Sequence, residues 1–330
     1  MQTRPFGRTG VDMSVIGLGC GAVGGLMVRG DRADQERVVA RALEAGVNYF
    51  DTAAQYGLGA SETNLGRVLA ASRPDVLVGT KVLLTEAALG DIAGWTARSL
   101  EGSLQRLGME RVDLFHLHNP IGSEGGEALS ARIVLDQVVP ALEKLREQGK
   151  ARLIGITAAG STGPLLDLVD AGAFQSAQVV YNMLNPSAGE TLPGGYPAQD
   201  YGRLLDHATT SGVGTIGIRV LAGGALSGTA ERHPIASPPP DPIGSAFSYD
   251  ADLRRARRLG TLVAEGFADS LPEAATRFAI SHAGLSTVLV GVANLDQFEQ
   301  ALAAAAKGPL PAEAIARLSA LQGGFVGGAR

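Results

Sequence analysis

The sequence predicts a single (β/α)8 barrel, and three observations support this fold class. Short apolar runs bounded by Gly, Asp or Asn alternate with amphipathic stretches of about 10 to 15 residues, the pattern of repeated βα units. The length of 330 residues suits such a barrel as one domain. The 45 glycines and the 45% apolar content fit a globular chain with many tight turns between strands and helices. We therefore expect one domain over residues 1–330.

Eight apolar runs are the predicted strands, and eight parallel strands with helical crossovers favour a closed barrel. The strands are expected at residues 14–19, 47–51, 76–81, 112–118, 151–157, 177–181, 214–220 and 287–291. The helices are expected at residues 33–45, 62–69, 93–107, 134–148, 164–171, 198–211, 253–266, 272–282 and 295–306. Gly46, Gly108 and Gly149 follow predicted helices and suit the left-handed position that ends a helix.

An open, doubly wound sheet is the alternative fold. Residues 17–22, GLGCGA, match the glycine-rich turn that binds a dinucleotide in such sheets. The next residues, VGGLMVRGD, are a poor start for the helix that this turn requires, because paired glycines disfavour a helix. We interpret these glycines, including Gly21, as residues that let the chain turn closely over a ligand in a barrel.

Three long connections follow predicted strands, at residues 119–133, 183–197 and 228–248. Loops of this length in a compact fold are usually functional or disordered. In a barrel all three would lie on the face that carries active sites.

The composition indicates which kind of binding partner and which cellular compartment to expect. The net charge of −5, with acids and bases interspersed, gives no electrostatic footprint for nucleic acid or an anionic membrane. No apolar stretch approaches the roughly 18 residues of a membrane helix, and residues 1–10 lack the apolar region of a signal peptide. Cys20 is the single cysteine, which excludes an intrachain disulfide. We expect a cytoplasmic protein with a small-molecule partner, and the oligomeric state stays open.

Four polar residues stand where predicted strands end or just beyond: Asp51, Tyr56, Lys81 and His118. In a parallel barrel these ends converge at one mouth. Reduction of a carbonyl by a nicotinamide hydride needs an acid for the developing alkoxide, and the reverse reaction needs a base at the same place. Tyr56 suits both if Lys81 draws its pKa toward neutrality, with Asp51 holding Lys81 and His118 hydrogen-bonding the substrate oxygen.

Asp51, Tyr56 and His118 also have other interpretations, whereas Lys81 at the end of an apolar strand needs a partner. Asp51 followed by Thr52 is also typical of a turn or a helix N-cap. Tyr56 followed by Gly57 is also typical of an ordinary loop. His116 and His118 share one strand face, which suggests a metal. Because no third ligand cluster accompanies them, we expect no metal site.

The order and content of these segments resemble the aldo-keto reductase family over nearly the whole chain. FDTAAQYG resembles the family's Asp and Tyr motif, GTKV its Lys motif and FHLHNP its His motif, while ASETNLGRVL and SLQRLGMERVDL also match. The resemblance implies a barrel closed at the bottom by a hairpin of residues 3–6 with 11–14. It also implies NAD(P)H bound without a Rossmann fold, and a catalytic tetrad of Asp51, Tyr56, Lys81 and His118.

The nicotinamide contacts implied by the family are altered here. The usual Ser-Asn pair is replaced by GITAA, so Thr157 keeps a hydroxyl but no amide follows, while Gln178 matches the family's glutamine. Ile218 and Arg219 stand where a tyrosine commonly stacks on the nicotinamide, and either is expected to cover the ring instead. Asp51 is also expected to lie near the cofactor.

The remaining cofactor contacts are implied by two later segments. AGGALSG resembles the loop that closes over the pyrophosphate, and the segment VLVGVANLDQFEQA resembles the one that binds the adenosine half. Their candidate ligands are Leu221, Gly223, Ser227, Gly291, Asn294 and Gln297. Members that prefer NADP often carry Lys or Arg here, and this chain does not unless Arg254 or Arg255 substitutes. The choice between NADP and NAD stays open.

The resemblance implies an oxidoreductase that interconverts aldehydes, ketones or sugar lactols with alcohols or lactones. The alternative is a regulatory or redox-sensing subunit that binds the nucleotide without significant turnover, and the intact tetrad counts against it. An isomerase or lyase on the same barrel would need different loop chemistry around a phosphate site. The sequence does not identify the substrate.

Overall fold

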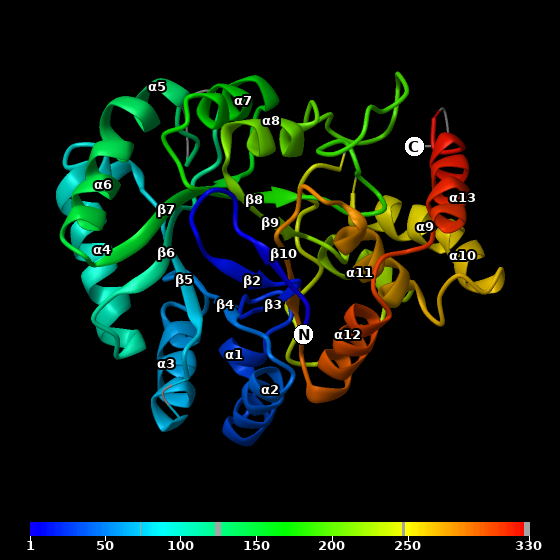
Figure 1. The fold of residues 1–330 in the computed structure, drawn as a ribbon, viewed down its shortest axis with the longest axis horizontal. Coiled ribbons are helices and arrows are strands. Elements are labelled where there is room, and N and C mark those ends of the chain that lie inside the picture. Colours follow the sequence, from blue (N-terminus) through cyan, green and yellow to red (C-terminus); the bar gives the residue numbers. More distant parts are fainter. Residues whose placement is uncertain (73, 123–126, 246–247, 327–330) are drawn as a thin grey trace.

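The computed structural model describes residues 1–72, 74–122, 127–245 and 248–326, and it contains a closed barrel of eight parallel strands (Figure 1). In chain order the barrel strands are β3 (Ile16–Gly19), β4 (Tyr49–Asp51), β5 (Leu77–Val82), β6 (Val112–Leu117), β7 (Ala151–Ala158), β8 (Ser176–Val180), β9 (Gly214–Ile218) and β10 (Thr287–Gly291). The predicted barrel is confirmed. The open sheet is excluded because β10 pairs with both β9 and β3, which closes the ring.

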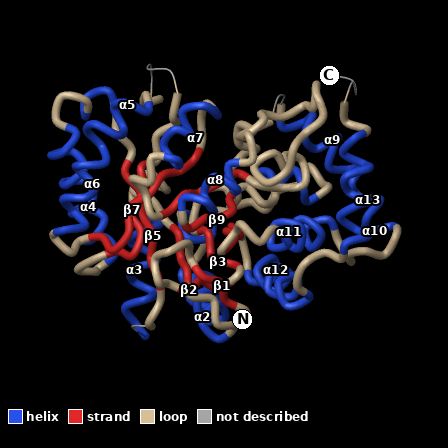
Figure 2. Tube along the Cα trace, turned by 45° about the horizontal axis from the view of Figure 1, so that its top comes forward, coloured by secondary structure: helices blue, strands red, loops and turns tan. Residues whose placement is uncertain are grey.

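Helices surround the strands in the tube view (Figure 2). They are α1 (Leu26–Arg29), α2 (Arg32–Glu44), α3 (Ala60–Ser72), α4 (Ile92–Leu107), α5 (Ala131–Ile133), α6 (Val139–Glu147), α7 (Thr162–Asp170), α8 (Leu204–Ser211), α9 (Tyr249–Leu259), α10 (Thr261–Ala264), α11 (Leu271–Ser281), α12 (Leu295–Lys307) and α13 (Ala312–Gly323). Three short turns complete the set: η1 (Glu86–Ala88) and η3 (Ala222–Ser227) are 3-10 turns, and η2 (Val134–Val138) is a π turn. Within the described ranges, no helix has the length and apolar character needed to cross a membrane.

The predicted hairpin is confirmed and closes one end of the barrel. Strands β1 (Thr3–Pro5) and β2 (Asp12–Ser14) pair antiparallel. Phe6 and Met13, both buried, belong to one apolar cluster with barrel residues that include Leu114 and Leu153. This cluster fills the N-terminal half of the barrel interior, so the C-terminal ends of the strands form the open mouth.

Gly46, Gly108 and Gly149 adopt the predicted left-handed conformation, with φ values of 77°, 65° and 73°. A residue with a Cβ is disfavoured there, which is why glycine marks the ends of these helices. Helix boundaries in this part of the chain were therefore readable from sequence.

Two helix predictions need correction. Residues 198–203 are not helical: Gly202 and Arg203 have φ values of 60° and 56°, and helix α8 begins only at Leu204. The predicted helix at residues 253–266 instead starts at Tyr249 and is interrupted at Gly260, giving α9 and α10. Helix α13, which was not predicted, lies beside α9 and α10 (Figure 1).

The three long loops follow β6, β8 and β9, as predicted, although residues 123–126 and 246–247 lie outside the described residues. The loop after β9 is tied to its neighbours on both sides. The Nδ2 of Asn185 donates to the carbonyl of Gly244 at 2.8 Å, and the Nε of Arg29 donates to the carbonyl of Ile235 at 2.6 Å. The loop therefore connects the segment after β8 with the segment after β3.

Candidate active site

The barrel brings the four predicted catalytic residues to one mouth. Asp51 is the last residue of β4, Lys81 lies near the end of β5, and His118 directly follows β6. Tyr56 lies in the turn that leads from β4 to α3. Residues on neighbouring parallel strands thus meet although they lie far apart in the sequence.

Lys81 is the centre of this group. Its Nζ donates to Oδ2 of Asp51 at 2.5 Å, to the carbonyl of Thr52 at 2.8 Å and to Oη of Tyr56 at 3.4 Å. Its side chain is 0% exposed. Burial by itself lowers the pKa of Lys81, but Asp51 and Tyr56 outweigh it and hold that pKa above the ordinary value. A permanent cation therefore lies between a carboxylate and a phenol.

Asp51 is held by two further donors, one of which sequence reasoning missed. Its Oδ1 accepts hydrogen bonds from Oη of Tyr49 at 2.9 Å and from Nε2 of Gln178 at 2.6 Å. The ring of Tyr49 occupies the barrel interior because residue 79 is glycine: a Cβ there would lie 2.6 Å from the Tyr49 hydroxyl. Tyr49 was detectable, because residues two apart on a strand share a face.

The pKa of Tyr56 departs from the sequence-based expectation. Burial raises this pKa above its ordinary value, and the opposing charges of Lys81 and Arg219 only reduce the shift. The expectation of a pKa drawn toward neutrality is therefore wrong for this structure, because the phenolate loses more hydration than Lys81 compensates. At neutral pH Tyr56 is a protonated phenol, the form that donates a proton.

His118 and His116 have different surroundings. The Nδ1 of His118 lies 3.3 Å from Oε1 of Gln55, and its ring meets the Tyr56 ring edge-on at 5.8 Å. Burial, aided by the Lys81 charge, lowers the pKa of His118 to about 3, so the ring is neutral. His116 is fully buried, with Nε2 at 2.6 Å from Oγ of Ser176. Among the described residues, no three His, Cys, Asp or Glu side chains form a group suited to a metal ion.

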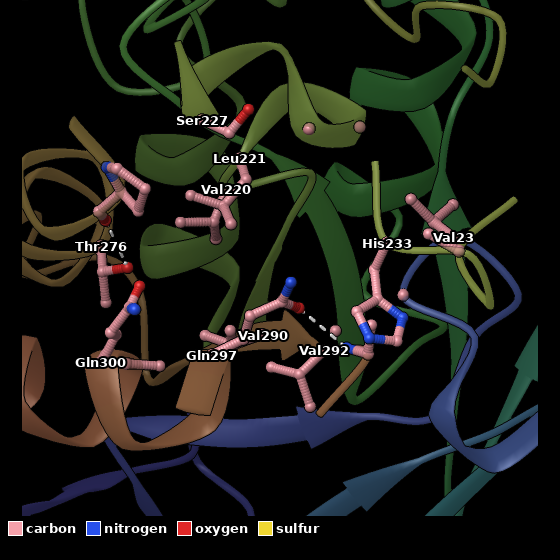
Figure 3. A pocket seen from close by; sticks show the side chains of 18 of the residues that line it. Val23, Val220, Leu221, Ser227, His233, Thr276, Val290, Val292, Gln297 and Gln300 are labelled. Carbon is pink, nitrogen blue, oxygen red and sulfur yellow. Dashed lines mark hydrogen bonds between the residues drawn. The ribbon is translucent and has the colours of Figure 1, made fainter. Parts of the chain in front are cut away.

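A groove of about 310 Å³ runs beside the mouth, between η3 and the start of α12 (Figure 3). Six of the predicted cofactor residues line it: Arg219, Leu221, Gly223, Ser227, Gly291 and Gln297. Thr276 and Gln300 lie at the end opposite Val23 (Figure 3). The glycine-rich η3 turn and the last barrel strand therefore face each other across one groove.

The other predicted cofactor residues do not line this groove. A Cβ on Gly21 would lie 3.5 Å from the Tyr56 ring. Oγ1 of Thr157 donates to Oε1 of Gln178 at 3.2 Å, which links both to Asp51. Ile218 packs against both apolar clusters. Asn294 caps α12, accepting from the backbone N–H of Gln297 at 3.0 Å.

Arg219 is the unusual cation of the groove. It has a left-handed backbone with φ of 56°, which is strained for a residue with a side chain. A Cβ on Gly223 would lie 3.2 Å from its Nη1, so its guanidinium lies against the η3 turn. Burial lowers the pKa of Arg219, and the charges of Tyr56, Tyr201 and Asp241 oppose this shift. The charge of Arg219 also lowers the pKa of Tyr56, although burial outweighs this effect.

Several groove residues were not predicted, most importantly Arg232 and the acidic Glu231 and Glu273. Arg232 donates from Nη1 to the carbonyl of Gly223 at 2.8 Å and from Nε to the carbonyl of Ser237 at 2.7 Å. It lies in a Pro-, Gly- and Ser-rich loop with no periodicity, so the sequence carried no signal for its position.

Arg254 and Arg255 were considered as cations for the cofactor, and neither lines the groove. Arg255 is buried, paired with Asp252, and donates from Nη1 to the carbonyl of Pro197 at 2.6 Å. Its guanidinium is therefore committed to joining the loop after β8 to α9, and the expectation that it substitutes in the groove is wrong.

Comparison with known proteins places this geometry in context. Residues 15–322 match the model of the Aldo/keto reductase family. The chain is 29% identical to L-galactose dehydrogenase of Arabidopsis thaliana over 315 residues, which cover 92% of this chain and 88% of that protein. It is 27% identical to pyridoxal 4-dehydrogenase of Microbacterium luteolum, with 91% of each covered. An aldo-keto reductase of Bacillus halodurans, solved in its holo form, has the same fold, with a TM-score of 0.71, 23% identity and coverage of 97% and 96%.

Proposed function

Because this chain belongs to the aldo/keto reductase family and is an oxidoreductase enzyme, we propose that it transfers hydride between NAD and a small carbonyl or sugar lactol, with Tyr56 as the proton-transfer residue. The observation that carries the proposal is the buried Lys81 ammonium, bonded to both Asp51 and Tyr56. A barrel that only bound a nucleotide would gain nothing from burying this ion pair beside a phenol, since a buried pair is weak evidence for stability.

In carbonyl reduction, the Oη of Tyr56 donates its proton to the substrate oxygen. Lys81 stabilises the phenolate that remains, and Asp51 keeps Lys81 charged and in place. His118, neutral at working pH, has one N–H with which to hydrogen-bond the same oxygen. The nicotinamide supplies or accepts the hydride when it is bound. In alcohol oxidation the proton returns to Tyr56.

The groove suits the phosphates of a dinucleotide. Ala222, Gly223 and Gly224 have φ values of 48°, 68° and 106°, and the N–H groups of Ala222 and Gly224 donate to the carbonyls of Arg219 and Leu221 at 2.7 and 2.8 Å, so the turn is tight and presents backbone without bulky side chains to the groove. Arg219 and Arg232 lie on either side of this turn: Cβ atoms on Gly223 and Gly224 would lie 3.2 and 2.5 Å from Nη1 of Arg219 and of Arg232. We assign the pyrophosphate to this turn.

We propose NAD rather than NADP as the nucleotide, on the charges of the groove residues. The 2′-phosphate of NADP is a dianion, best held by two cationic partners. Gln297 and Gln300 line the groove and are uncharged, and the Glu273 carboxylate, which also lines it, is paired with Arg277 and Lys307. Arg232 lies against the η3 turn assigned to the pyrophosphate, with Nε and Nη1 bonded to the carbonyls of Ser237 and Gly223, so we do not assign it to a 2′-phosphate. A ribose hydroxyl, in contrast, can bond to these amide groups directly.

The names of the relatives support a hydroxylated substrate. L-galactose dehydrogenase and pyridoxal 4-dehydrogenase are both named for oxidising a compound that carries hydroxyl groups. Polar groups at this chain's mouth, such as Gln55 and His118, offer hydrogen bonds to such a substrate. We therefore propose an aldose dehydrogenase type of reaction, lactol to lactone.

The test is nicotinamide absorbance with NAD⁺ and NADP⁺ in parallel against a panel of aldoses and simple alcohols. NADH and NADPH are then tested against aldehydes, ketones and quinones. The proposal expects NAD-linked turnover that is highest with an aldose. Turnover should be retained in Tyr201→Phe, the matched control for Tyr56→Phe, because the Tyr201 hydroxyl has no hydrogen-bond partner in the described residues. Binding of a nucleotide without turnover on any substrate would instead indicate the sensing subunit.

A further inference from the structure

Tyr49 lies next to Asp51 in the barrel interior. The two residues are two apart on β4, so they share one face of the strand. The Tyr49 side chain is fully buried, and its Oη donates to Oδ1 of Asp51 at 2.9 Å. Its ring belongs to the apolar cluster that fills the N-terminal half of the barrel. The hydroxyl is therefore the part of Tyr49 that reaches the polar site at the mouth.

Two glycines on the neighbouring strands make room for this ring. A Cβ on Gly17 of β3 would lie 3.0 Å from Cδ1 of Tyr49, and a Cβ on Gly79 of β5 would lie 2.6 Å from its Oη. Strands β3 and β5 are the two that pair with β4. The contact at Gly79 is with the hydroxyl itself, which a phenylalanine would lack. The barrel therefore leaves space for a tyrosine, hydroxyl included, beside Asp51.

The hydroxyl of Tyr49 is a permanent hydrogen-bond donor. Burial raises the pKa of Tyr49 well above its ordinary value, and the negative charge of Asp51 raises it further. Tyr49 therefore stays protonated at neutral and mildly alkaline pH. An ionised carboxylate only accepts hydrogen bonds, so the single hydrogen of the phenol is directed at Asp51.

This donor determines which oxygen of Asp51 faces Lys81. Oδ1 accepts from Oη of Tyr49 at 2.9 Å and from Nε2 of Gln178 at 2.6 Å, whereas Oδ2 accepts from Nζ of Lys81 at 2.5 Å. Because Oδ1 is occupied, the carboxylate does not turn to offer both oxygens to Lys81. The ammonium keeps a third hydrogen bond, to Oη of Tyr56 at 3.4 Å.

We propose that Tyr49 is a positioning residue, whose hydroxyl holds Asp51 with only Oδ2 toward Lys81 and so keeps the Lys81 ammonium shared with Tyr56. The inference rests on the proposed function for its effect on rate, but the contact with Asp51 is a property of the protein alone. Without the hydroxyl, Asp51 would bind Lys81 more strongly. The charge of Asp51 already raises the pKa of Tyr56, and with one donor fewer this pKa should rise further.

Tyr49→Phe is the direct test, since it removes one hydroxyl and keeps the ring. We expect kcat for alcohol oxidation at neutral pH to fall by about 3- to 10-fold, the range for a single hydrogen bond, with the KM for NAD unchanged. The alkaline rise in kcat should have its midpoint at higher pH, because Tyr56 ionises later. The loss should therefore narrow as the pH rises and Tyr56 ionises in both proteins.

Tyr181→Phe is the matched control. Tyr181 is also buried and also donates to a carboxyl group, that of Glu190, at 3.4 Å. Its variant should keep the wild-type kcat and pH profile. A purely structural role for Tyr49 predicts a different pattern in Tyr49→Phe: kcat would fall by the same factor at every pH, together with the melting temperature. An unmoved midpoint, or a wild-type kcat at neutral pH, would overturn the inference.

Denaturant unfolding tests whether Tyr49 acts through Asp51, independently of turnover. In Asp51→Ala the Tyr49 hydroxyl has lost its carboxylate acceptor, so Tyr49→Phe should cost less stability in that background than in the wild type. Equal costs in the two backgrounds would also overturn the inference. Failure of the proposed function is a different result: a wild type that binds nucleotide without turnover, in which the unfolding comparison still tests the contact between Tyr49 and Asp51.

Discussion

Replacing Asp51 with asparagine removes the carboxylate that neutralises the buried Lys81 ammonium. The two side chains are 5% and 0% exposed, with Oδ2 and Nζ separated by 2.5 Å. Asp51 accepts from Lys81 on one oxygen and from Tyr49 and Gln178 on the other. Asparagine has a single acceptor oxygen, so its NH₂ group must face at least one of these donors. We expect both the fold and the chemistry to suffer.

The size of the effect follows from this geometry. At an effective dielectric constant of about 20, two unit charges at this separation attract by about 6 to 7 kcal/mol. In the variant Lys81 can release its proton, which avoids part of this loss. We therefore expect the free energy of unfolding to fall by about 3 to 5 kcal/mol, the usual cost of breaking a buried ion pair. An unfolding entropy of about 2.1 cal/mol/K per residue gives about 0.7 kcal/mol/K for this chain. The melting temperature should therefore fall by about 4 to 7 °C.

Calorimetry of the wild type, Asp51→Asn, Lys81→Met and the double variant measures this coupling. The double variant removes both charges, so it should be more stable than the two single losses added together predict. Asp91→Asn is the matched control: Asp91 is 60% exposed and caps α4, where asparagine serves equally well. Its melting temperature should stay within about 1 °C of the wild type.

Two results would refute this reasoning. A fall of less than about 1 °C for Asp51→Asn would mean that Lys81 is not held as a buried cation. Strictly additive losses in the double variant would mean that the two side chains do not interact across the 2.5 Å contact.

Three further predictions follow from the same geometry. Since burial holds the pKa of Tyr56 above its ordinary value, kcat for alcohol oxidation should rise with pH through the alkaline range, while kcat for carbonyl reduction stays level at neutral pH. Measuring the pH profile of kcat in both directions checks this. An oxidation rate that peaks in mild acid would contradict it. Gln297→Arg should raise the preference for NADP over NAD, measured as the ratio of kcat/KM values, by about 10-fold or more, because a hydrogen bond to a charged group contributes roughly 1.5 to 3 kcal/mol. Gly79→Ala should destabilise the protein by about 1 to 3 kcal/mol in denaturant unfolding, because its Cβ would lie 2.6 Å from the Tyr49 hydroxyl. Gly163→Ala, on α7 with nothing within 4 Å, should instead stabilise it by about 0.5 to 1 kcal/mol, and equal effects of the two substitutions would argue against the close contact.

Much of the framework could be predicted because local signals are strong there. Apolar runs mark the eight barrel strands, and Gly46, Gly108 and Gly149 mark helix ends with left-handed residues. The convergence of Asp51, Lys81 and His118 followed from their place at strand ends, since a parallel barrel brings those ends together. The strand and helix positions depend on residues close together in the sequence, and the convergence of the strand ends follows from the barrel topology itself.

What sequence reasoning missed depends on tertiary contacts. Arg232 reaches the carbonyls of Gly223 and Ser237 from a loop without periodicity. The pKa of Tyr56 depends on how far the folded chain excludes water, which no pattern of residue types reports. Residues 198–203 have helix-compatible composition, but Gly202 and Arg203 adopt left-handed conformations that end the pattern. In each case the decisive partner lies elsewhere in the fold.

The central claim, that Tyr56 transfers the proton, is tested most directly by Tyr56→Phe. The substitution removes one hydroxyl, which accepts from Lys81 at 3.4 Å, and leaves the groove residues unchanged. We predict that kcat falls by about 100- to 10,000-fold, the range for loss of a general acid, while the Kd for NAD measured by fluorescence titration stays within about 3-fold of the wild type. Retained turnover, or a loss of NAD binding equal to the loss of turnover, would contradict the assignment.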